Sequence, residues 1–467
     1  MTGRPPDTQT EPGRTLTGWG RTAPSWARVV TPRDDGEVAT LLSPLPGRGA
    51  RGVIARGLGR SYGDAAQRSG GVVLDMTALA DLGAVDPASG LITVGGGLCL
   101  DDLIRASLPG GWFVPVTPGT RQVTVGGAIA ADIHGKNHHV DGSFCRHVTS
   151  LTLVTPTGTH ELGPDNEPEL FWATAGGMGL TGVVTRATLR MQPVETSFVT
   201  VDTARFEDLD AVMAEMEHTD SAYRYSVAWV DCMGRGGHLG RAVLTRGDHS
   251  PSSALHPGRR SAALRAPGQP RLRVPVAAPW GLLTAATMAA FNELWFRKAP
   301  RHRAGAIEPL GSFFHPLDGV ADWNLLYGSR GFVQYQFVVP DQHDEIVRVA
   351  IGRMSASGVP SFLAVLKRFG PGDPGPLSFP RAGWTLALDF PLGPPALAPL
   401  LDELDELVAG AGGRVYLAKD ARLRPELLTR MYPRAGEFNE VRRRVDPEGV
   451  LRSDLSTRLG LDADWAQ

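Results

Sequence analysis

The stretch Arg56-Gly57-Leu58-Gly59-Arg60-Ser61-Tyr62-Gly63-Asp64 follows a short β-rich run and carries three glycines. Glycine lets the backbone turn tightly and brings free N–H groups close to a ligand, so such a loop can hold a pyrophosphate. The spacing is GxGxxxG and no helical pattern follows before Asp75, unlike the GxGxxG of nicotinamide-binding Rossmann folds. Taken alone, the loop fits an ordinary turn as often as a ligand site, so its neighbours decide.

Two further glycine-rich segments follow in the same part of the chain. Residues 117–135 run from a Pro118-Gly119 turn into a predicted helix start at Gly126 and Gly127, where unpaired N–H groups suit phosphate oxygens. Residues 175–184 form a predicted turn into a β-rich run, suited to lie along the rest of a nucleotide cofactor. Three such loops exceed chance and together predict a cofactor-binding domain.

Bulk properties bound the remaining possibilities. A chain of 467 residues predicts two or three domains, and a formal net charge of −2 gives no reason to expect nucleic acid. The three cysteines, Cys99, Cys145 and Cys232, form no CxxC pair and predict neither disulfides nor zinc. Residues 1–15 contain no apolar run and residues 274–291 are interrupted by prolines, so we expect no secretory signal and no transmembrane helix, and a cytoplasmic protein.

The pattern of strands divides the chain in two. Short β-rich runs alternate with glycine turns up to about residue 191, and longer strand patterns follow at 225–229, 332–338 and 384–390. We predict an α+β fold with a cofactor domain at 1–195, completed by about 415–467. A substrate domain at 196–414 is predicted to be an antiparallel sheet flanked by helices, with a mobile loop at about 255–275.

The three glycine segments, in this order and spacing, resemble the FAD domain of the vanillyl-alcohol oxidase superfamily of PCMH-type flavoproteins. The resemblance implies the two-domain fold, FAD and oxidation chemistry. Many members attach FAD to a histidine of the first glycine loop, and this loop has Tyr62 and no histidine, so we expect non-covalent FAD. The resemblance places these residues against the cofactor: Arg56, Gly57, Leu58, Gly59, Arg60, Ser61, Tyr62, Gly63, Thr117, Pro118, Gly119, Thr124, Gly126, Gly127, Ala130, Ile133, His134, Gly135, Asn137, His138, Gly179, Gly182, Val183, Val184 and Tyr416.

Further segments resemble one family within that superfamily, the decaprenylphosphoryl-β-D-ribose 2′-oxidases. They cover nearly the whole chain, at residues 16–24, 132–139, 332–340, 367–372, 376–380, 416–420, 431–433 and 445–447. The resemblance implies oxidation of the 2′-hydroxyl of a polyprenyl-phosphate ribose to a 2′-keto sugar. An NAD(P)-dependent 2-keto reductase would complete the epimerisation to the arabinose donor for cell-wall arabinan.

Three residues are predicted to act in the chemistry. Lys419 is the leading candidate, because burial lowers a lysine's pKa and its ammonium can hydrogen-bond a hydroxyl or stabilise reduced flavin. Most lysines lie on the surface, and the similarity of residues 416–420 to the family outweighs that prior. The family also places His134 and Tyr62 against the flavin and the substrate. His138 and His139 are adjacent rather than three or four apart, so we expect no metal.

The substrate pocket is predicted on the second domain. Gln334 and Gln336 share one face of a strand and can hold sugar hydroxyls, and the family places Lys367 and Trp229 in the same pocket. A core position fits Trp229 almost as well. The remaining predicted substrate contacts are Thr385 and Ala387. Well-known members carry a cysteine at the position of Ala387 that nitroaromatic inhibitors attack, so covalent trapping is not expected here. A family member carries Asn at the position of Thr385, and this difference bears on the contacts near the flavin.

Two questions stay open at this stage. The basic loop 255–273, followed by the apolar residues 277–283, fits a membrane-surface mouth for a prenyl phosphate and a merely solvated loop equally well. The family has also been placed outside the cytoplasm. The alternative functions are an FAD-dependent alditol or aldonolactone oxidase on a free soluble sugar, and a catalytically silent FAD-binding subunit.

Overall fold

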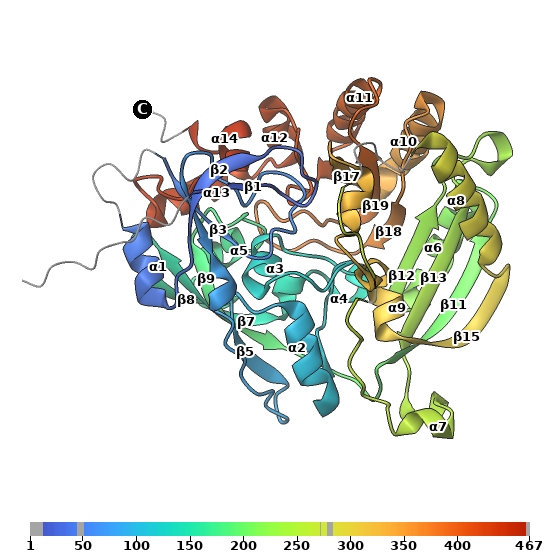
Figure 1. Ribbon diagram of the computed structural model, residues 1–467, viewed down its shortest axis with the longest axis horizontal. Coiled ribbons are helices and arrows are strands. Elements are labelled where there is room, and N and C mark those ends of the chain that lie inside the picture. The colour runs from blue at the N-terminus through green and yellow to red at the C-terminus, as the bar shows by residue number, and fades with distance from the viewer. Residues whose placement is uncertain (1–12, 44–50, 271, 278–283, 464–467) are drawn as a thin grey trace, which may run out of the picture.

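The computed structural model describes residues 13–43, 51–270, 272–277 and 284–463. Figure 1 shows a half drawn in blue, cyan and red, next to a half drawn in green, yellow and orange. Both helices and sheets occur in each half, so the fold is mixed α+β, as predicted from the sequence.

Two four-stranded sheets form the first half. In one, β2, β4 and β3 are parallel and β1 is antiparallel to β2; the strands are β1 (Arg14–Leu16), β2 (Ser25–Val30), β4 (Val72–Asp75) and β3 (Val53–Arg56). The other is antiparallel, in the order β5 (Leu91–Gly95), β9 (Val183–Arg190), β7 (Val148–Thr155) and β8 (Gly158–Leu162). A small pair, β6 (Trp112–Phe113) and β10 (Gln192–Pro193), stands beside them.

Short helices connect these strands. Helix α1 buries Val38 and Leu42, which pack with Val53 and Val154 in a small apolar core between the sheets. The helices of this half are α1 (Asp35–Leu42), α2 (Leu100–Ser107), α3 (Val125–Ala130), α4 (His138–Asp141) and α5 (Pro168–Thr174). Helix α3 begins next to Gly126, where the sequence predicted a helix start.

An antiparallel sheet of eight strands forms the second half. Its order is β15 (His302–Pro309), β11 (Phe198–Phe206), β13 (Ala242–His249), β12 (Tyr225–Val230), β18 (Ala364–Phe369), β19 (Gly383–Pro391), β17 (Phe332–Val339) and β20 (Arg414–Val415). Every residue of β17 and β19 is buried, because one face packs on helices and the other faces the first half. The predicted strands at 225–229, 332–338 and 384–390 are confirmed.

Helices flank this sheet, as Figure 1 shows for α6, α8, α10 and α11. Their bounds are α6 (Leu209–Thr219), α7 (Pro257–Arg260), α8 (Ala285–Lys298), α9 (Leu310–Phe314), α10 (Glu345–Ser357) and α11 (Leu397–Gly410). The predicted loop 255–275 contains α7 and the strand β14 (Leu272–Arg273), which pairs with β16 (Val320–Ala321). Its mobility stays a prediction, and residues 271 and 278–283, which include most of the predicted apolar stretch, lie outside the described residues. None of the described helices is long and apolar enough to cross a membrane.

The C-terminal helices return to the first half. They are α12 (Pro425–Met431), α13 (Ala435–Val445) and α14 (Asp454–Arg458), drawn in red beside the blue strands in Figure 1. Backbone bonds join Val53 to Val450 and Arg452 at 2.8 and 3.0 Å. The domain limits at 195 and 414 stay a prediction, although this return is the arrangement that they require.

Arg458 of α14 connects the C-terminal helices to the first glycine loop. Its guanidinium forms two bonds to the Asp64 carboxylate, at 2.8 and 2.9 Å, and pairs with Asp420 at 2.9 Å. Both carboxylates are buried. Asp64 ends the glycine loop and Asp420 follows Lys419, so one side chain holds two predicted site segments together.

We expect Arg458→Met to lower the free energy of unfolding by about 3 kcal/mol, because it leaves two buried carboxylates without their cation. The matched control is Arg444→Met, since Arg444 pairs with Glu169 through two exposed side chains and should change stability by under about 1 kcal/mol. Urea unfolding followed by tryptophan fluorescence measures both. Equal losses for the two variants would contradict the role given to Arg458.

Candidate active site

A cavity of about 790 Å³ lies between the two halves, within the size range of about 300–1,000 Å³ for ligand pockets. All three glycine segments reach it, and strands β17, β18 and β19 close its other side. The predicted site residues that line it are Arg56, Gly57, Leu58, Gly59, Arg60, Ser61, Tyr62, Pro118, Gly119, Thr124, Gly126, Gly127, Ala130, Ile133, His134, Gly179, Gly182, Val183, Val184, Gln334, Gln336, Lys367, Ala387, Tyr416 and Lys419.

The first glycine loop offers unused hydrogen-bond donors to the cavity. Among the described residues, the backbone N–H groups of Leu58, Gly59, Arg60 and Ser61 donate no hydrogen bond. Gly59 has φ +62°, and a Cβ on Gly57 would lie 2.1 Å from Thr124 Oγ1, so both positions need glycine. A row of free N–H groups in a half-buried loop fits the pyrophosphate of a dinucleotide cofactor.

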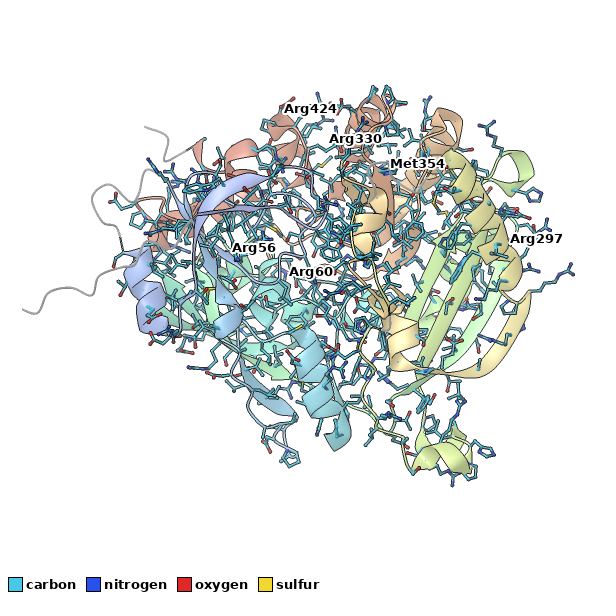
Figure 2. All side chains as sticks on the ribbon, in the orientation of Figure 1. Arg56, Arg60, Arg297, Arg330, Met354 and Arg424 are labelled. Carbon is cyan, nitrogen blue, oxygen red and sulfur yellow. The ribbon has the colours of Figure 1, made fainter. Side chains whose placement is uncertain are left out.

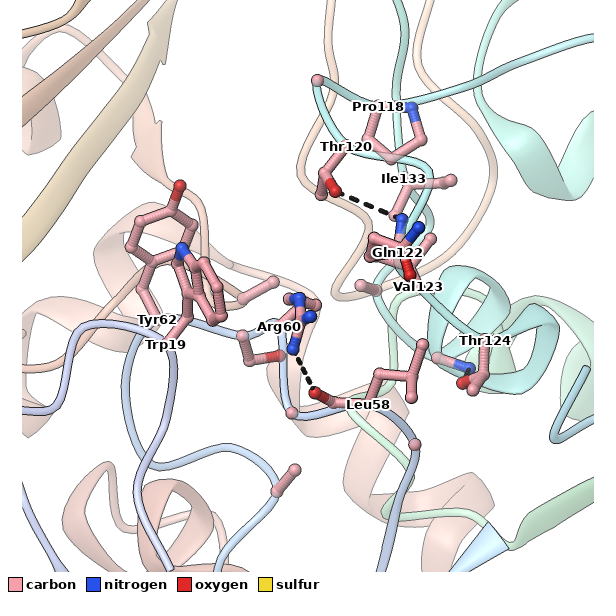
Figure 3. Close-up of a pocket in the computed structure, with 18 of the residues that line it drawn as sticks. Trp19, Leu58, Arg60, Tyr62, Pro118, Thr120, Gln122, Val123, Thr124 and Ile133 are labelled. Carbon is pink, nitrogen blue, oxygen red and sulfur yellow. Dashed lines mark hydrogen bonds between the residues drawn. The ribbon is translucent and has the colours of Figure 1, made fainter. Parts of the chain in front are cut away.

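The second glycine segment forms the wall opposite this loop. Figure 3 shows Pro118, Thr120 and Gln122 on one side of the cavity and Tyr62 on the other, with Arg60 between them. Thr124 Oγ1 accepts a bond from Gly127 N at 3.2 Å and so fixes the start of α3. A Cβ on Gly119 would meet nothing within 4 Å, which leaves open space where a ligand can approach the backbone.

The register of strands β17, β19 and β18 decides which of their side chains face the cavity. Gln336 lies opposite Ala387, and Ala387 lies opposite Val365, so one row of side chains crosses β17, β19 and β18. Directly opposite residues of antiparallel strands share a face of the sheet. Lys367 follows two residues after Val365 and therefore points to the same side.

His134 and Lys367 meet at the centre of this face. Lys367 Nζ lies 3.1 Å from His134 Nδ1, and Gln336 Nε2 lies 3.1 Å from His134 Nε2. Gln336 Nε2 also donates to Thr385 Oγ1 at 3.0 Å. Burial lowers the pKa of His134 well below its usual value, and the neighbouring Lys367 and Lys419 lower it further. The imidazole is therefore neutral at physiological pH.

Lys419 and Asp389 form a second polar cluster. The Asp389 carboxylate accepts bonds from Gln334 Nε2 and, at 3.3 Å, from Tyr327 OH. Burial raises the pKa of Asp389 to about 6, against the opposing effects of Gln334 and Lys419. Burial lowers the pKa of Lys419 to about 8, and Asp389 counteracts it. The Lys419 Nζ lies 5.0 Å from the centre of the Tyr62 ring.

Sequence reasoning missed the aromatic mouth of the cavity. Trp19 and Trp323 both line it, with ring centres 5.8 Å apart, and the Arg60 guanidinium lies 4.2 Å from the Trp19 ring. Figure 2 places Arg60 in the middle of the molecule, between the two halves. The motif at residues 16–24 contains Trp19, but Trp323 has no motif that could have revealed it. Asp389 was also missed, although it lies two residues after Ala387 on β19 and therefore on the same face of the sheet.

Seven predicted contacts do not line the cavity: Gly63, Thr117, Gly135, Asn137, His138, Trp229 and Thr385. Gly63 packs against the backbone of Asp420, where a Cβ would lie 2.0 Å from the carbonyl oxygen. Trp229 stands opposite Val365, one strand beyond the lining row. Thr385 is fully buried behind Gln336.

The other four belong to the supporting layer behind the second segment. Thr117 Oγ1 bonds to His315 Nε2 at 2.8 Å, and Asn137 Nδ2 donates to the Pro115 carbonyl at 2.9 Å. His138 Nε2 bonds to Ser143 at 3.2 Å. A Cβ on Gly135 would lie 3.1 Å from the Thr117 carbonyl. These residues shape the cavity wall through their neighbours. The described residues hold no group of three His, Cys, Asp or Glu able to bind a metal.

Two domain families match the chain. The FAD binding domain family matches residues 26–162, which contain the first two glycine segments. The D-arabinono-1,4-lactone oxidase family matches residues 394–459, which run from α11 to the end of α14. Together they identify an FAD-dependent oxidoreductase, as the sequence predicted.

Comparison with individual proteins gives a narrower likeness. The chain is 45% identical to decaprenylphosphoryl-β-D-ribose oxidase of Mycolicibacterium smegmatis, over 96% of this chain and 98% of that protein. An uncharacterised protein in the mprA 5′ region of Streptomyces coelicolor is 44% identical over 78% of this chain and all of that protein. Cytokinin dehydrogenase 5 of Oryza sativa subsp. japonica is 35% identical over 35% of this chain and 33% of that protein.

We expect Gly119→Val to weaken FAD binding at least about tenfold while leaving the fold intact. The added side chain meets no protein atom within 4 Å of its Cβ and enters the open space of the cavity, where we expect the cofactor to bind. Flavin titration monitored by fluorescence quenching measures the affinity, and circular dichroism checks the fold. The control Gly436→Ala lies on helix α13 with open space around it and should bind FAD normally. Unchanged affinity in Gly119→Val would show that this wall does not touch the flavin.

Proposed function

Because the chain belongs to the decaprenylphosphoryl-β-D-ribose oxidase family, we propose that it oxidises the 2′-hydroxyl of decaprenylphosphoryl-β-D-ribose to the 2′-keto sugar, with FAD as cofactor. The 45% identity over nearly the full length of both chains carries this proposal. The polar sheet face that borders the cavity supports it, since amides and amines are the groups that bind sugar hydroxyls.

Bound FAD supplies the hydride acceptor for this oxidation. The free N–H groups of residues 58–61 would hold its pyrophosphate. Gln334 Oε1 and Gln336 Oε1 are buried and have no hydrogen-bond partner among the described residues, so each is available to accept a hydrogen bond from a hydroxyl of the sugar. No histidine stands in the first glycine loop, which agrees with a dissociable cofactor.

We propose that Lys419 is the cation of the site. Its ammonium has no hydrogen-bond acceptor among the described residues, and the Asp389 carboxylate favours its charged form. An ammonium at this place would stabilise reduced FAD electrostatically and would donate a hydrogen bond to the sugar hydroxyl. Tyr62 and Gln334 are proposed to orient the sugar beside it.

The free-sugar oxidase alternative is not proposed. The lactone oxidase family matches only residues 394–459, and the sheet residues Gln334, Gln336 and Lys367 lie outside that segment. The silent-subunit alternative loses its basis too, since the polar groups of the cavity are all in place.

Two further partners belong to the proposal. A keto sugar that is to become arabinose must be reduced again from the other face, so an NAD(P)-dependent reductase is expected to take the product.

We also propose a cytoplasmic enzyme in peripheral contact with the membrane that holds the prenyl chain. The exposed side chains of residues 255–277 that support this contact are Leu272, Val276, Arg259 and Arg260.

Anaerobic mixing of the yellow protein with a polyprenyl-phosphoryl ribose should bleach its flavin absorption band. We expect Lys419→Met to keep FAD and to bleach about 10²–10³ times more slowly, the loss typical of one electrostatic donor to a transition state. Stopped-flow absorbance at the flavin band measures both rates.

The control is Lys298→Met, at the exposed end of α8, which should bleach at the wild-type rate. Bleaching by free polyols instead of the lipid sugar would move the assignment to a soluble-sugar oxidase. Wild-type kinetics in Lys419→Met would remove the role proposed for that lysine.

We expect the protein to sediment with vesicles that contain anionic lipid and to stay in solution with neutral vesicles. Replacing both Arg259 and Arg260 by Glu should lower the vesicle-bound fraction severalfold, because each basic side chain near such a surface contributes about 1 kcal/mol. Arg51→Glu, at an exposed position before β3, serves as the control. Equal binding to both kinds of vesicle would speak against the basic loop as the contact.

A further inference from the structure

A chain of hydrogen bonds that ends at Lys367 fixes where the protons of the sugar-binding face lie. The Thr385 hydroxyl donates a hydrogen bond to the Phe337 carbonyl at 2.8 Å. A hydroxyl has one proton, so the Thr385 oxygen is left to accept. Gln336 Nε2 donates to that oxygen at 3.0 Å, which sets the orientation of its amide group.

The same amide nitrogen decides the tautomer of His134. Gln336 Nε2 carries hydrogens and cannot accept, and it lies 3.1 Å from His134 Nε2. His134 Nε2 must therefore accept, and the proton of the neutral imidazole stands on Nδ1, as assigned from these partners. That Nδ1 lies 3.1 Å from Lys367 Nζ. An ammonium cannot accept a hydrogen bond, so this geometry requires Lys367 as an uncharged amine.

The charges around Lys367 favour the same state. The titratable groups near it are Lys419, Lys136, His134 and His138, all of which are cationic or neutral. No carboxylate among the described residues hydrogen-bonds to it, and its other polar contact is the Gly135 carbonyl at 3.5 Å. Burial lowers the pKa of Lys367 to about 7, with help from Lys419 and Lys136. The surroundings of Lys419 differ, because the Asp389 carboxylate raises the pKa of Lys419 against the effect of burial.

Building on the proposed oxidation, we propose that Lys367 enters the reaction uncharged and accepts the proton of the hydroxyl that is oxidised, with Thr385 and Gln336 as positioning residues. The hydroxyl O–H bond breaks and its proton forms a new N–H bond at Nζ, which becomes an ammonium. The carbinol C–H bond would break, and FAD, when bound, would supply the acceptor for its hydrogen and two electrons. A C=O bond forms, so atoms and electrons balance.

Two features make this transfer feasible. Rotation about the Cε–Nζ bond turns the lone pair from His134 to the substrate, and Lys367 lines the cavity where the substrate binds. A base whose pKa lies near the working pH is also the most effective one. The division of roles is then clear: Lys419 keeps its charge, and Lys367 takes up the proton.

Lysine NMR of the oxidised holoenzyme tests the charge state directly. The chain has four lysines, at positions 136, 298, 367 and 419, so ¹⁵Nζ labelling gives a spectrum of four signals. Lys367→Met and Lys419→Met assign two of them, and the nitrogen shift separates amine from ammonium. We expect Lys367 to lose its proton with a midpoint near pH 7, about one pH unit below Lys419.

Thr385→Val tests the positioning role. Without the hydroxyl, the Gln336 amide is free to turn over and present Oε1 to His134 Nε2. The imidazole proton then moves to Nε2, and Nδ1 accepts from a charged Lys367, so the midpoint of Lys367 should rise by about one pH unit. The low-pH limb of kcat/KM should move upward by the same amount, and Thr385→Ser should restore both values.

The outcomes separate cleanly. A Lys367 that stays charged up to pH 9 in the wild-type holoenzyme overturns the proposal, whatever Thr385→Val does. A low-pH limb that does not follow the Lys367 midpoint overturns the proton transfer. Failure of the proposed function looks different: the flavin stays oxidised with the lipid sugar although Lys367 titrates near pH 7.

Discussion

The site depends on the attachment of the first glycine loop to the segment that carries Lys419. Arg458 holds the carboxylates at the ends of both segments, Asp64 and Asp420. The backbone N–H of Tyr62 donates to the Ala418 carbonyl at 2.9 Å, and Gly63 leaves no room for a side chain against Asp420. Residues more than 350 positions apart in the chain are thereby fixed at hydrogen-bond distance. A cation and a pyrophosphate loop can then share one cofactor.

The second constraint is electrostatic. Two lysines line one cavity, and each raises the cost of charging the other. Asp389 stands on β19 where it favours Lys419, and Gln334 and Tyr327 hold it there through hydrogen bonds. One carboxylate for two lysines leaves the other amine without a counter-charge. The unequal surroundings of the two side chains therefore lower the pKa of Lys367 further than that of Lys419.

The sequence predicted the fold class and most of the cavity wall, because both depend on local features. Glycine spacing and strand alternation at β17 and β19 act over a few residues, and they correctly brought Gly59, Gln336 and Lys367 to one cavity. Contacts between segments that are distant in the chain were not predicted from the sequence. Trp323 reaches the cavity from a 3-10 helix, Trp323–Tyr327, that carries no motif. Thr385 was predicted to touch substrate and does share the sheet face of Lys367, but the Gln336 amide packs on its hydroxyl and Thr385 does not line the cavity.

The balance of lysine and arginine in the composition also points to the site. Only four of the 47 basic residues are lysine, so arginine is the ordinary cation of this chain. Two of those four lysines, Lys367 and Lys419, line the cavity and act on His134, and a third, Lys136, donates to the Phe313 carbonyl outside the cavity. Arginine keeps its charge under all physiological conditions, whereas a buried lysine can release its proton. The two lysines that line the cavity, Lys367 and Lys419, can therefore change charge where an arginine could not.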